Sequence, residues 1–164
     1  ANLAMAHSAL EKNLKEYEKW NYMIRAKLFK GLLDKSMKVG SFFDDEKVKL
    51  VSAKKCSYCG VGDQLSLNHV FPQNLGGKDL SDKLIYSCRS CNSSKGKKDL
   101  MEWMNYKGTF PRLSVLRRYL KLVIRYCSEN DLMECSIEEL KEYSLPFMIK
   151  YIPLSYPNLS EMKL

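Results

Sequence analysis

Two Cys-x-x-Cys pairs constrain the fold of this chain more than any other feature of its sequence. Cys56 and Cys59 form the first pair, CSYC, and Cys88 and Cys91 form the second, CRSC, with twenty-eight residues between the pairs. The two-residue spacing lets both thiolates of a pair face one ion, and two such pairs complete a tetrahedral site. Zinc is the expected metal for a closed, redox-inert sulfur site. The sequence therefore predicts a small fold held together by a structural zinc ion.

Two disulfides are the competing interpretation of these four cysteines. The N-terminal segment AHSALEKNLKEYEKW shows no apolar region or cleavage pattern of a secretion signal, so we expect an intracellular, cytoplasmic chain. Thiols stay reduced in that compartment, which favours the zinc site. Cys127 and Cys135 lack a partner at the required spacing, and we interpret them as small buried hydrophobic residues.

The positive charge of the chain is concentrated in one segment. The 164 residues carry a formal net charge of +8, and residues 88–125 hold ten Lys and Arg against two acids. A local basic block favours an anionic partner, with nucleic acid as the first candidate and a merely solvated face as the alternative. A disordered chain is excluded by the hydrophobic content of 45%. No apolar run reaches the length of about 18 residues that a membrane helix needs, so we expect no membrane contact.

Hydrophobic periodicity and turn signals predict an α+β protein. We expect a helix over residues 8–30 that starts at a Ser8–Glu11 capping box and stops at Gly31. The remaining expected elements are a short helix over 44–53, a strand over 65–69, a loop over 70–80, a short strand over 84–86, a helix from Asn92 to about Tyr106 softened by Gly96, a helix over 113–127 and a helix after a Ser136–Glu139 capping box.

These elements fall into three regions. Residues 1–53 form an N-terminal helical extension, residues 54–107 form the turn-rich core with the cysteines, and residues 108–164 form a C-terminal helical region with an irregular tail. The first helix packs against the core in one interpretation. In the other it is the interface of a homodimer or the docking arm for a partner protein.

Residues of about 54–105 resemble the HNH endonuclease family. The matching pieces are CSYCG, NHVFPQNLGG and LIYSCRSCNSSKG, which agree with the family in order and spacing. The resemblance implies a small zinc-stabilised ββα-metal core flanked by the N- and C-terminal helices. It also implies a metal-dependent DNA endonuclease that hydrolyses phosphodiester bonds.

The resemblance assigns roles to three residues. In the family, the His at the position of His69 is the general base that activates water. The residue before it and a residue just after the last Cys bind one divalent metal, and these positions are Asn68 and Asn92 here. Mg²⁺ or Mn²⁺ is the expected catalytic cation, because hard ions prefer oxygen ligands. The zinc ion at Cys56, Cys59, Cys88 and Cys91 would support the frame and take no part in the chemistry.

Two positions depart from the family pattern. Asn68 stands where the family usually has Asp, so the proposed site has no anionic protein ligand, and we expect low metal affinity until phosphate supplies negative charge. Reduced or engineered-away activity is the corresponding expectation for the enzyme. Natural divergence, a degenerate site and an engineered inactivating change all remain open for Asn68. Lys83 stands where the family often has Asn, and either contacts a phosphate or lies exposed, the latter being favoured.

Basic side chains near the proposed site are the candidate DNA contacts. The first group surrounds the expected start of the helix at Asn92, where a helix N-terminus attracts anions. The second group lies on one face of the helix over 113–127. The complete set is Arg89, Lys95, Lys97, Lys98, Arg117, Arg118, Lys121 and Arg125. Such contacts give affinity and salt dependence with little sequence recognition.

Three hypotheses follow for the function. The first is a metal-dependent DNA endonuclease, with restriction or phage defence as a plausible setting. The second is a non-catalytic, zinc-stabilised DNA-binding module with a degenerate site. The third is a nuclease subunit whose activity needs a partner protein. Replacing Asn68 by Asp separates the first from the second, and co-purification of another chain would favour the third.

Overall fold

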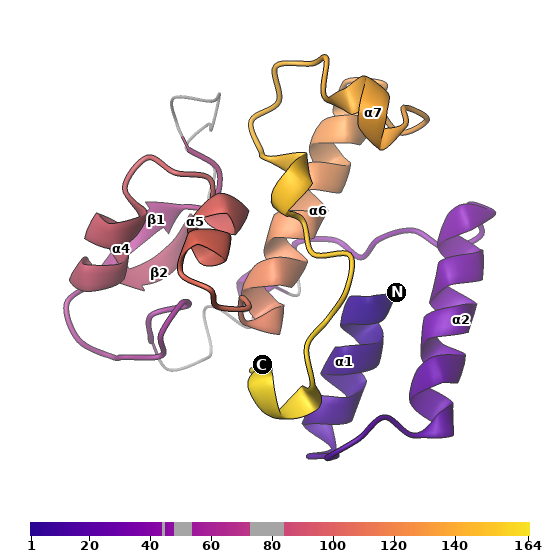
Figure 1. Ribbon diagram of the computed structural model, residues 1–164, viewed down its shortest axis with the longest axis horizontal. Coiled ribbons are helices and arrows are strands. Elements are labelled where there is room, and N and C mark those ends of the chain that lie inside the picture. The colour runs from indigo at the N-terminus through magenta and orange to yellow at the C-terminus, as the bar shows by residue number, and fades with distance from the viewer. Residues whose placement is uncertain (44, 48–53, 73–83) are drawn as a thin grey trace.

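The protein places a small two-stranded sheet and two short helices beside a long helix that carries the N-terminal helices on its other side (Figure 1). The computed structural model describes residues 1–43, 45–47, 54–72 and 84–164. The strands are β1 (Leu65–His69) and β2 (Leu84–Cys88). The helices are α1 (Asn2–Glu11), α2 (Lys19–Leu33), α4 (Arg89–Lys95), α5 (Leu100–Tyr106), α6 (Leu113–Glu129) and α7 (Ile137–Leu140), followed by the 3₁₀ turns η3 (Ile149–Tyr151) and η4 (Leu159–Glu161). This composition confirms the predicted α+β class.

The N-terminal region contains two helices where the sequence predicted one. The expected helix over 8–30 is wrong, because Asn13 adopts a left-handed φ of 53° just after α1 and ends it. The capping box belongs to Glu18 and Asn21 at the start of α2. Ser8 lies inside α1, where its hydroxyl donates to the carbonyl of Met5 and accepts from the Asn21 side chain. Ser8, which we assigned to a helix start, therefore joins α1 to α2.

Gly31 does not end α2, contrary to the prediction. The helix continues to Leu33, and Gly31 is buried because Met37 folds back over it. A methyl group on Gly31 would lie 2.6 Å from the Met37 side chain, so the absence of a side chain permits this contact. Glycine serves packing here and leaves the helix unbroken.

The two strands form an antiparallel hairpin with Asn68 opposite Ile85 and His69 opposite Leu84. Both predicted strands are confirmed, and β2 extends two residues further than expected, to Cys88. The helix expected to start at Asn92 starts at Arg89, because Cys88 caps it by accepting a hydrogen bond from the Cys91 amide. The second cysteine pair therefore reaches from the strand end into the first turn of α4.

The helix expected to reach Tyr106 is split into α4 and α5. Gly96 has a φ of 52°, which ends α4, and the Asp99 carboxylate caps α5 by accepting from the amides of Met101 and Glu102. The indole of Trp103 donates to Ser94 across the break at 3.0 Å. Trp103 is buried, whereas Tyr106 at the end of α5 is 81% exposed.

One hydrophobic core joins the hairpin to the C-terminal region. Val70, Leu100, Leu116 and Phe147 come from four parts of the chain and are all buried in it. Phe71 packs edge-on against Tyr119 of α6, with ring centroids 5.3 Å apart. The buried face of α6 confirms the helix predicted over 113–127, and α7 begins at the Ser136–Glu139 capping box as predicted.

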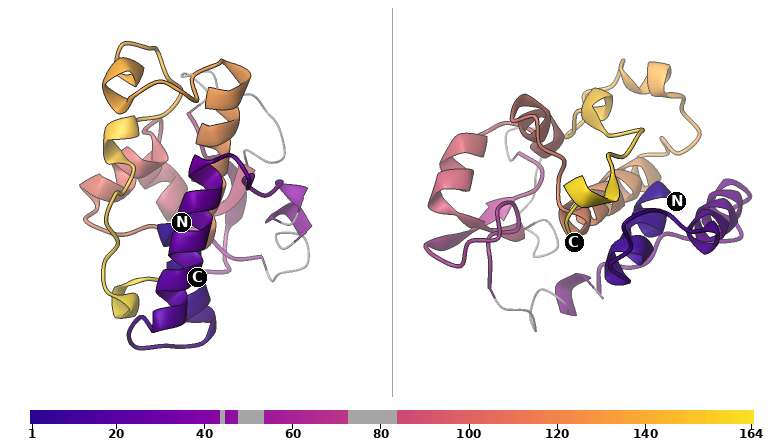
Figure 2. Two further views of the ribbon diagram at one scale, coloured as in Figure 1. Left: turned by 90° about the vertical axis from the view of Figure 1, so that its right-hand side faces the viewer. Right: turned by 60° about the horizontal axis from the view of Figure 1, so that its bottom comes forward.

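A smaller core fixes the first helix to the rest of the molecule. Ala6 and Ala9 of α1 pack against Leu113, Leu159 and Met162, which belong to the start of α6 and the C-terminal tail. In the right-hand view of Figure 2, α1 lies between α6 and α2, so α2 is the outermost helix. Packing on the core, the first of our two interpretations, therefore holds for α1.

Part of the sequence prediction lies outside the described residues. The predicted short helix over 44–53 is described only at 45–47, which are helical. Lys83 and most of the loop predicted over 70–80 are also outside the described ranges. Within the part of the chain that is described, no helix is long and apolar enough to cross a membrane.

Candidate metal centre and active site

The four cysteines of the two pairs converge at the junction of the hairpin and α4. The Sγ atoms of Cys56, Cys59, Cys88 and Cys91 all lie within 4.8 Å of one another. Cys59 Sγ and Cys88 Sγ are 3.7 Å apart. Tetrahedral zinc with Zn–S bonds of about 2.3 Å places its sulfur ligands about 3.8 Å from one another. The cluster therefore fits a zinc ion, and all four cysteines are free thiols, as that site requires.

The loop around Cys56 prepares its sulfur for a cation. The Gly60 amide donates to the Cys56 carbonyl at 2.8 Å, and Gly60 has a φ of 87°, which closes the tight turn. Burial disfavours the Cys56 thiolate, but backbone N–H groups of Cys59, Cys88 and Tyr58 point toward it. Together they lower the pKa of Cys56 to about 6. A thiolate available near neutral pH is the form that binds metal.

A polar pocket of about 420 Å³ lies at the end of β1. Its lining brings together the three residues with predicted catalytic roles, together with two of the predicted DNA contacts. The lining residues are Leu67, Asn68, His69, Pro72, Asn92, Lys95, Gly96 and Lys97. β1 supplies Asn68 and His69, and α4 supplies Asn92. The zinc cluster fixes this arrangement, because Cys88 and Cys91 join β2 to α4 next to it.

Asn68 and Asn92 contact each other across the pocket wall. The Asn68 amide nitrogen donates a short hydrogen bond to Asn92 Oδ1. Asn68 is 7% exposed, and its Oδ1 is buried with no hydrogen-bond partner. Amide oxygens are ligands of the type that Mg²⁺ accepts. The donor atoms therefore fit a hard cation in type, and the pocket wall contains no carboxylate among the described residues.

The burial of Lys95 is the feature of this pocket that the sequence did not predict. It lines the pocket yet is only 2% exposed. Burial lowers the pKa of Lys95 to about 8, and the nearby Asp99 carboxylate opposes that shift. Asp99 is itself buried, accepts from the Tyr119 hydroxyl at 2.9 Å, and has a pKa raised by burial. Lys95 and Asp99 are four residues apart in the sequence but lie on either side of the break at Gly96, so helical periodicity gave no signal of their proximity.

The predicted DNA contacts near the pocket occupy different surroundings. Arg89, Lys97 and Lys98 are exposed, whereas Lys95 is buried. Lys95 occupies the last turn of α4, and Lys97 and Lys98 follow it. They therefore lie at the opposite end of the helix from the expected N-terminus, because α4 begins three residues before Asn92.

The predicted contacts on α6 are engaged by Ser41, Phe42, Asp45 and Glu46. Arg117 Nη2 contacts Asp45 Oδ1 at 2.6 Å, and Lys121 Nζ contacts Asp45 Oδ2 at 2.5 Å. Arg118 is buried and pairs with Glu46. The Arg125 guanidinium lies 4.0 Å from the centre of the Phe42 ring. These internal contacts reduce what the α6 cations can offer to an external phosphate.

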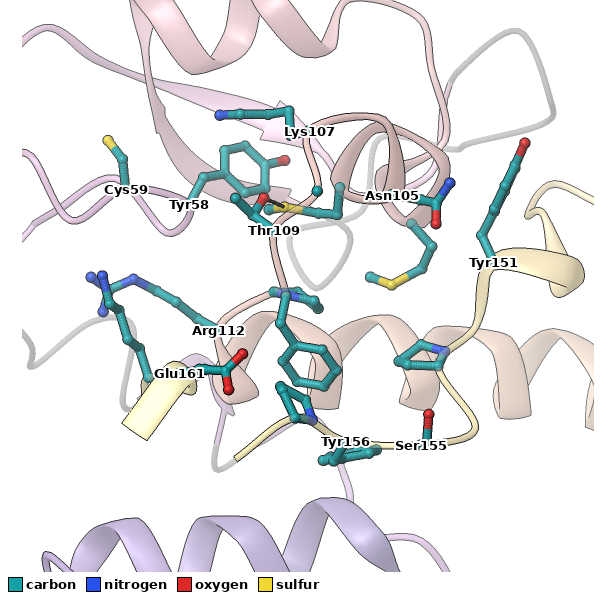
Figure 3. Close-up of a pocket in the computed structure, with 18 of the residues that line it drawn as sticks. Tyr58, Cys59, Asn105, Lys107, Thr109, Arg112, Tyr151, Ser155, Tyr156 and Glu161 are labelled. Atoms are coloured by element: carbon teal, nitrogen blue, oxygen red, sulfur yellow. Dashed lines mark hydrogen bonds between the residues drawn. The ribbon is translucent and has the colours of Figure 1, made fainter. Parts of the chain in front are cut away.

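A larger cavity of about 830 Å³ lies away from His69 and Asn92, between α5, the start of α6 and the C-terminal tail (Figure 3). Tyr58 and Lys107 lie at one side of it, and Tyr151, Ser155 and Tyr156 line the other. Cys59 and Cys91 of the cysteine cluster reach its edge. This larger cavity therefore contains none of the three residues with predicted catalytic roles.

One comparison with known proteins matches the segment that contains the cysteine cluster and both strands. Residues 56–102 match the family model described as HNH endonuclease. Among solved structures, the chain is similar to the Type II-C Cas9 enzyme from Actinomyces naeslundii, with 20% identity and a TM-score of 0.34, over 90% of this chain and 16% of that chain. The chain thus spans only a small part of the length of that Cas9 enzyme. A search of curated proteins gave no match. The predicted HNH resemblance is confirmed for this segment.

Proposed function

We propose that this protein is a metal-dependent DNA endonuclease whose active site is the pocket at the end of β1. One observation carries the proposal: His69, Asn68 and Asn92 line a single pocket, and Asn92 directly follows Cys91 of the four-cysteine cluster. The matched segment belongs to a family of endonucleases, and it spans the cluster, both strands and α4. Restriction or phage defence is a setting that suits such an enzyme.

His69 is the proposed general base. Its imidazole sits at the last position of β1, where it lines the pocket beside Asn92 and Lys97. A water molecule in the pocket would lose its proton to His69 as it attacks the phosphorus atom. The amide oxygens of Asn68 and Asn92 would hold a divalent cation such as Mg²⁺ or Mn²⁺, which would supply the charge that stabilises the leaving 3′ oxygen.

Lys95 and Lys97 are the proposed positive charges for the scissile phosphate. Asn68 and Asn92 are neutral, so the pocket compensates little of the phosphate charge through its metal ligands. The ammonium of Lys95 is largely shielded from water, which strengthens its interaction with an anion. Lys97 is exposed at the rim, where it can guide the DNA backbone. Arg89 and Lys98 remain proposed contacts to neighbouring phosphates.

Plasmid nicking tests the proposal directly. Supercoiled DNA with Mg²⁺ or Mn²⁺ should be converted to open-circle and linear forms, and the ends should carry 5′-phosphates. His69→Ala should abolish the conversion, since general-base catalysis contributes about 10²–10⁴-fold. His7→Ala is the matched control, because His7 pairs with Glu11 on α1, far along the chain from the pocket. Equal rates for the wild type and His69→Ala would refute the assignment.

A non-catalytic DNA-binding module is the alternative that the Asn68 position favours. It predicts salt-dependent DNA binding, no cutting with either metal, and no gain from Asn68→Asp. The division into three regions that we proposed from the sequence is compatible with either function, since residues 54–107 contain both the cysteine cluster and the pocket.

An exposed apolar stripe on α2 favours a nuclease subunit that works with a partner or as a homodimer. Tyr22, Phe29 and Leu33 follow one another at helical spacing and are 51%, 61% and 72% exposed. Lys19, Arg25, Lys27 and Lys30 surround the stripe, and α2 contains no acid. Phe29→Glu should prevent association in size-exclusion chromatography if α2 is the contact, and should leave the elution volume unchanged if it is not.

A further inference from the structure

A separate cavity of about 310 Å³ lies between β2, the first cysteine loop and the start of α6. Its lining is rich in cations, which come from three different parts of the chain: Lys55, Arg112, Arg117 and Arg118. The hydroxyl residues Ser57 and Ser114 also line it. Asp45 is the acidic lining residue among those that the structure describes. A cavity with such a lining is suited to an oxyanion.

The local acids do not neutralise these cations. Asp45 is shared by Arg117 and Lys121, and Glu46 pairs with Arg118. Arg112 donates to the main-chain oxygen of Leu164 at 3.1 Å. Lys55 is exposed. Among the residues that the structure describes, the side chains of Asp45 and Glu46 face four lining cations and Lys121, so the side-chain charges leave a positive excess.

Two guanidinium groups in the lining have unused hydrogen-bond donors. The Nε atoms of Arg112 and Arg117 are buried and make no hydrogen bond in the structure. A buried donor without an acceptor is costly, and a bound oxyanion would satisfy it. The start of α6 points the same way. Arg112, at its N-cap, forms no capping bond, and the first turn contains no acid, so an anion there would also complete the helix end.

The cavity lies on the opposite strand of the hairpin from the proposed catalytic pocket. Ile85 lines this cavity, whereas Asn68, its partner in the strand register, lines the catalytic pocket. We propose that the cavity binds a phosphate group of the DNA backbone other than the phosphate that is cut. This inference rests on the proposed function, because it assigns a second anchor to the same DNA. The anchor explains why cations gather at a site that contains no catalytic side chain.

Ser114→Glu is a variant that fills the cavity with negative charge without harming the helix. Ser114 is exposed in the first turn of α6, where a carboxylate interacts favourably with the helix dipole, so the variant should fold normally. Ser128→Glu is the matched control, with the same charge change at an exposed position near the other end of α6. Thermal unfolding verifies both folds, and Arg117→Gln provides a second test of the cavity.

The readout is the affinity for a short labelled duplex without added divalent metal, measured from about 50 to 200 mM salt. Ser114→Glu and Arg117→Gln should each reduce the slope of log K against log salt by about one, the loss of one phosphate contact. Ser128→Glu should leave the slope unchanged. Equal slopes in all four proteins would overturn the inference. A second experiment measures the thermal unfolding of the wild type with and without inorganic phosphate. If phosphate stabilises the protein but no variant changes the salt slope of DNA binding, the assignment of the cavity to the DNA backbone is overturned.

The same measurements separate the two proposals. A wild type that cuts DNA while Ser114→Glu keeps the full salt slope retains the proposed function and loses the second anchor. A wild type that never cuts with Mg²⁺ or Mn²⁺ while Ser114→Glu loses one phosphate contact retains the anchor and loses the nuclease assignment.

Discussion

The side-chain amide of Asn68 on β1 donates a hydrogen bond to Asn92 Oδ1 on α4, so two neutral groups meet where the proposed cation would be held. This bond occupies one oxygen that a metal needs, while Asn68 Oδ1 remains buried and unpartnered. The pocket is therefore shaped for an oxygen-loving ion but lacks the charge to attract one strongly. Any cation bound there must depend on the phosphate of the substrate for charge balance.

Asn68→Asp should strengthen metal binding and cutting. A carboxylate accepts a hydrogen bond from Asn92 once the Asn92 amide turns over, and it brings the anionic ligand that the pocket lacks. We expect the Mn²⁺ concentration for half-maximal nicking to fall by about tenfold or more, which corresponds to about 1.4 kcal/mol. Plasmid nicking over a metal titration measures this change.

The double variant Asn68→Asp, His69→Ala is the control for that experiment. It keeps the added carboxylate and removes the proposed base, so it should bind metal as tightly as Asn68→Asp and cut no faster than His69→Ala. If Asn68→Asp neither binds metal more tightly nor cuts, the non-catalytic DNA-binding module becomes the better reading.

Loss of one cysteine of the cluster should release zinc and destabilise the hairpin. Cys91→Ser removes a buried ligand that joins α4 to the sheet, and structural zinc contributes about 10–16 kcal/mol of apparent binding energy in small zinc peptides. We expect one zinc ion per wild-type chain by elemental analysis and a large drop in the unfolding temperature of Cys91→Ser. Cys127→Ala tests burial alone, since Cys127 is also buried but lies outside the cluster, and it should keep its zinc. Equal zinc content in the wild type and Cys91→Ser would contradict the assignment.

Lys95→Met should make the protein more stable and less active. The pKa of Lys95 falls from 10.5 to about 8, so the buried ammonium costs the folded state about 3 kcal/mol near neutral pH. The unfolded chain binds the extra proton between pH 8 and 10.5, so wild-type stability should rise with pH in that window. Lys95→Met should remove this rise with pH. Its free energy of unfolding at pH 7 should increase by about 2 kcal/mol, less than the full cost of the buried ammonium, because Asp99 loses its countercharge. Urea unfolding at pH 7 and pH 9.5 measures both effects.

Lys97→Met is the matched control for Lys95→Met. Lys97 lines the same pocket but is exposed, so its replacement should leave stability and its pH dependence unchanged. A loss of stability in Lys95→Met at pH 7 would mean that its buried charge helps the fold, against our expectation.

The hairpin and the cysteine cluster followed from the sequence because their signals are local. The two-residue spacing within each cysteine pair depends on neighbouring residues only. The same is true of the alternation in 65–69. The break at Asn13 was missed because a left-handed asparagine has no periodic signature, and the apolar stripe of 8–30 continues across it. The burial of Lys95 and the pairing of Arg117 with Asp45 were missed because both depend on contacts between distant segments.

Asp45→Asn should lower the free energy of unfolding far more than the loss of an exposed ion pair whose charged atoms are equally close. The Asp45 side chain is 4% exposed and holds both Arg117 and Lys121, so its neutralisation leaves two cations without their carboxylate in a largely buried site. We expect a loss of about 3 kcal/mol, as for other broken buried pairs. Lys35→Gln breaks the Lys35–Glu134 pair, which is 2.6 Å long but 77% and 79% exposed, and should change stability little because water screens the pair. Urea unfolding of the two variants compares them, and equal losses would show that residues 45–47 do not anchor α6.

The same Asp45→Asn variant frees Arg117 for phosphate, so it should bind duplex DNA more tightly than the wild type even though it is less stable.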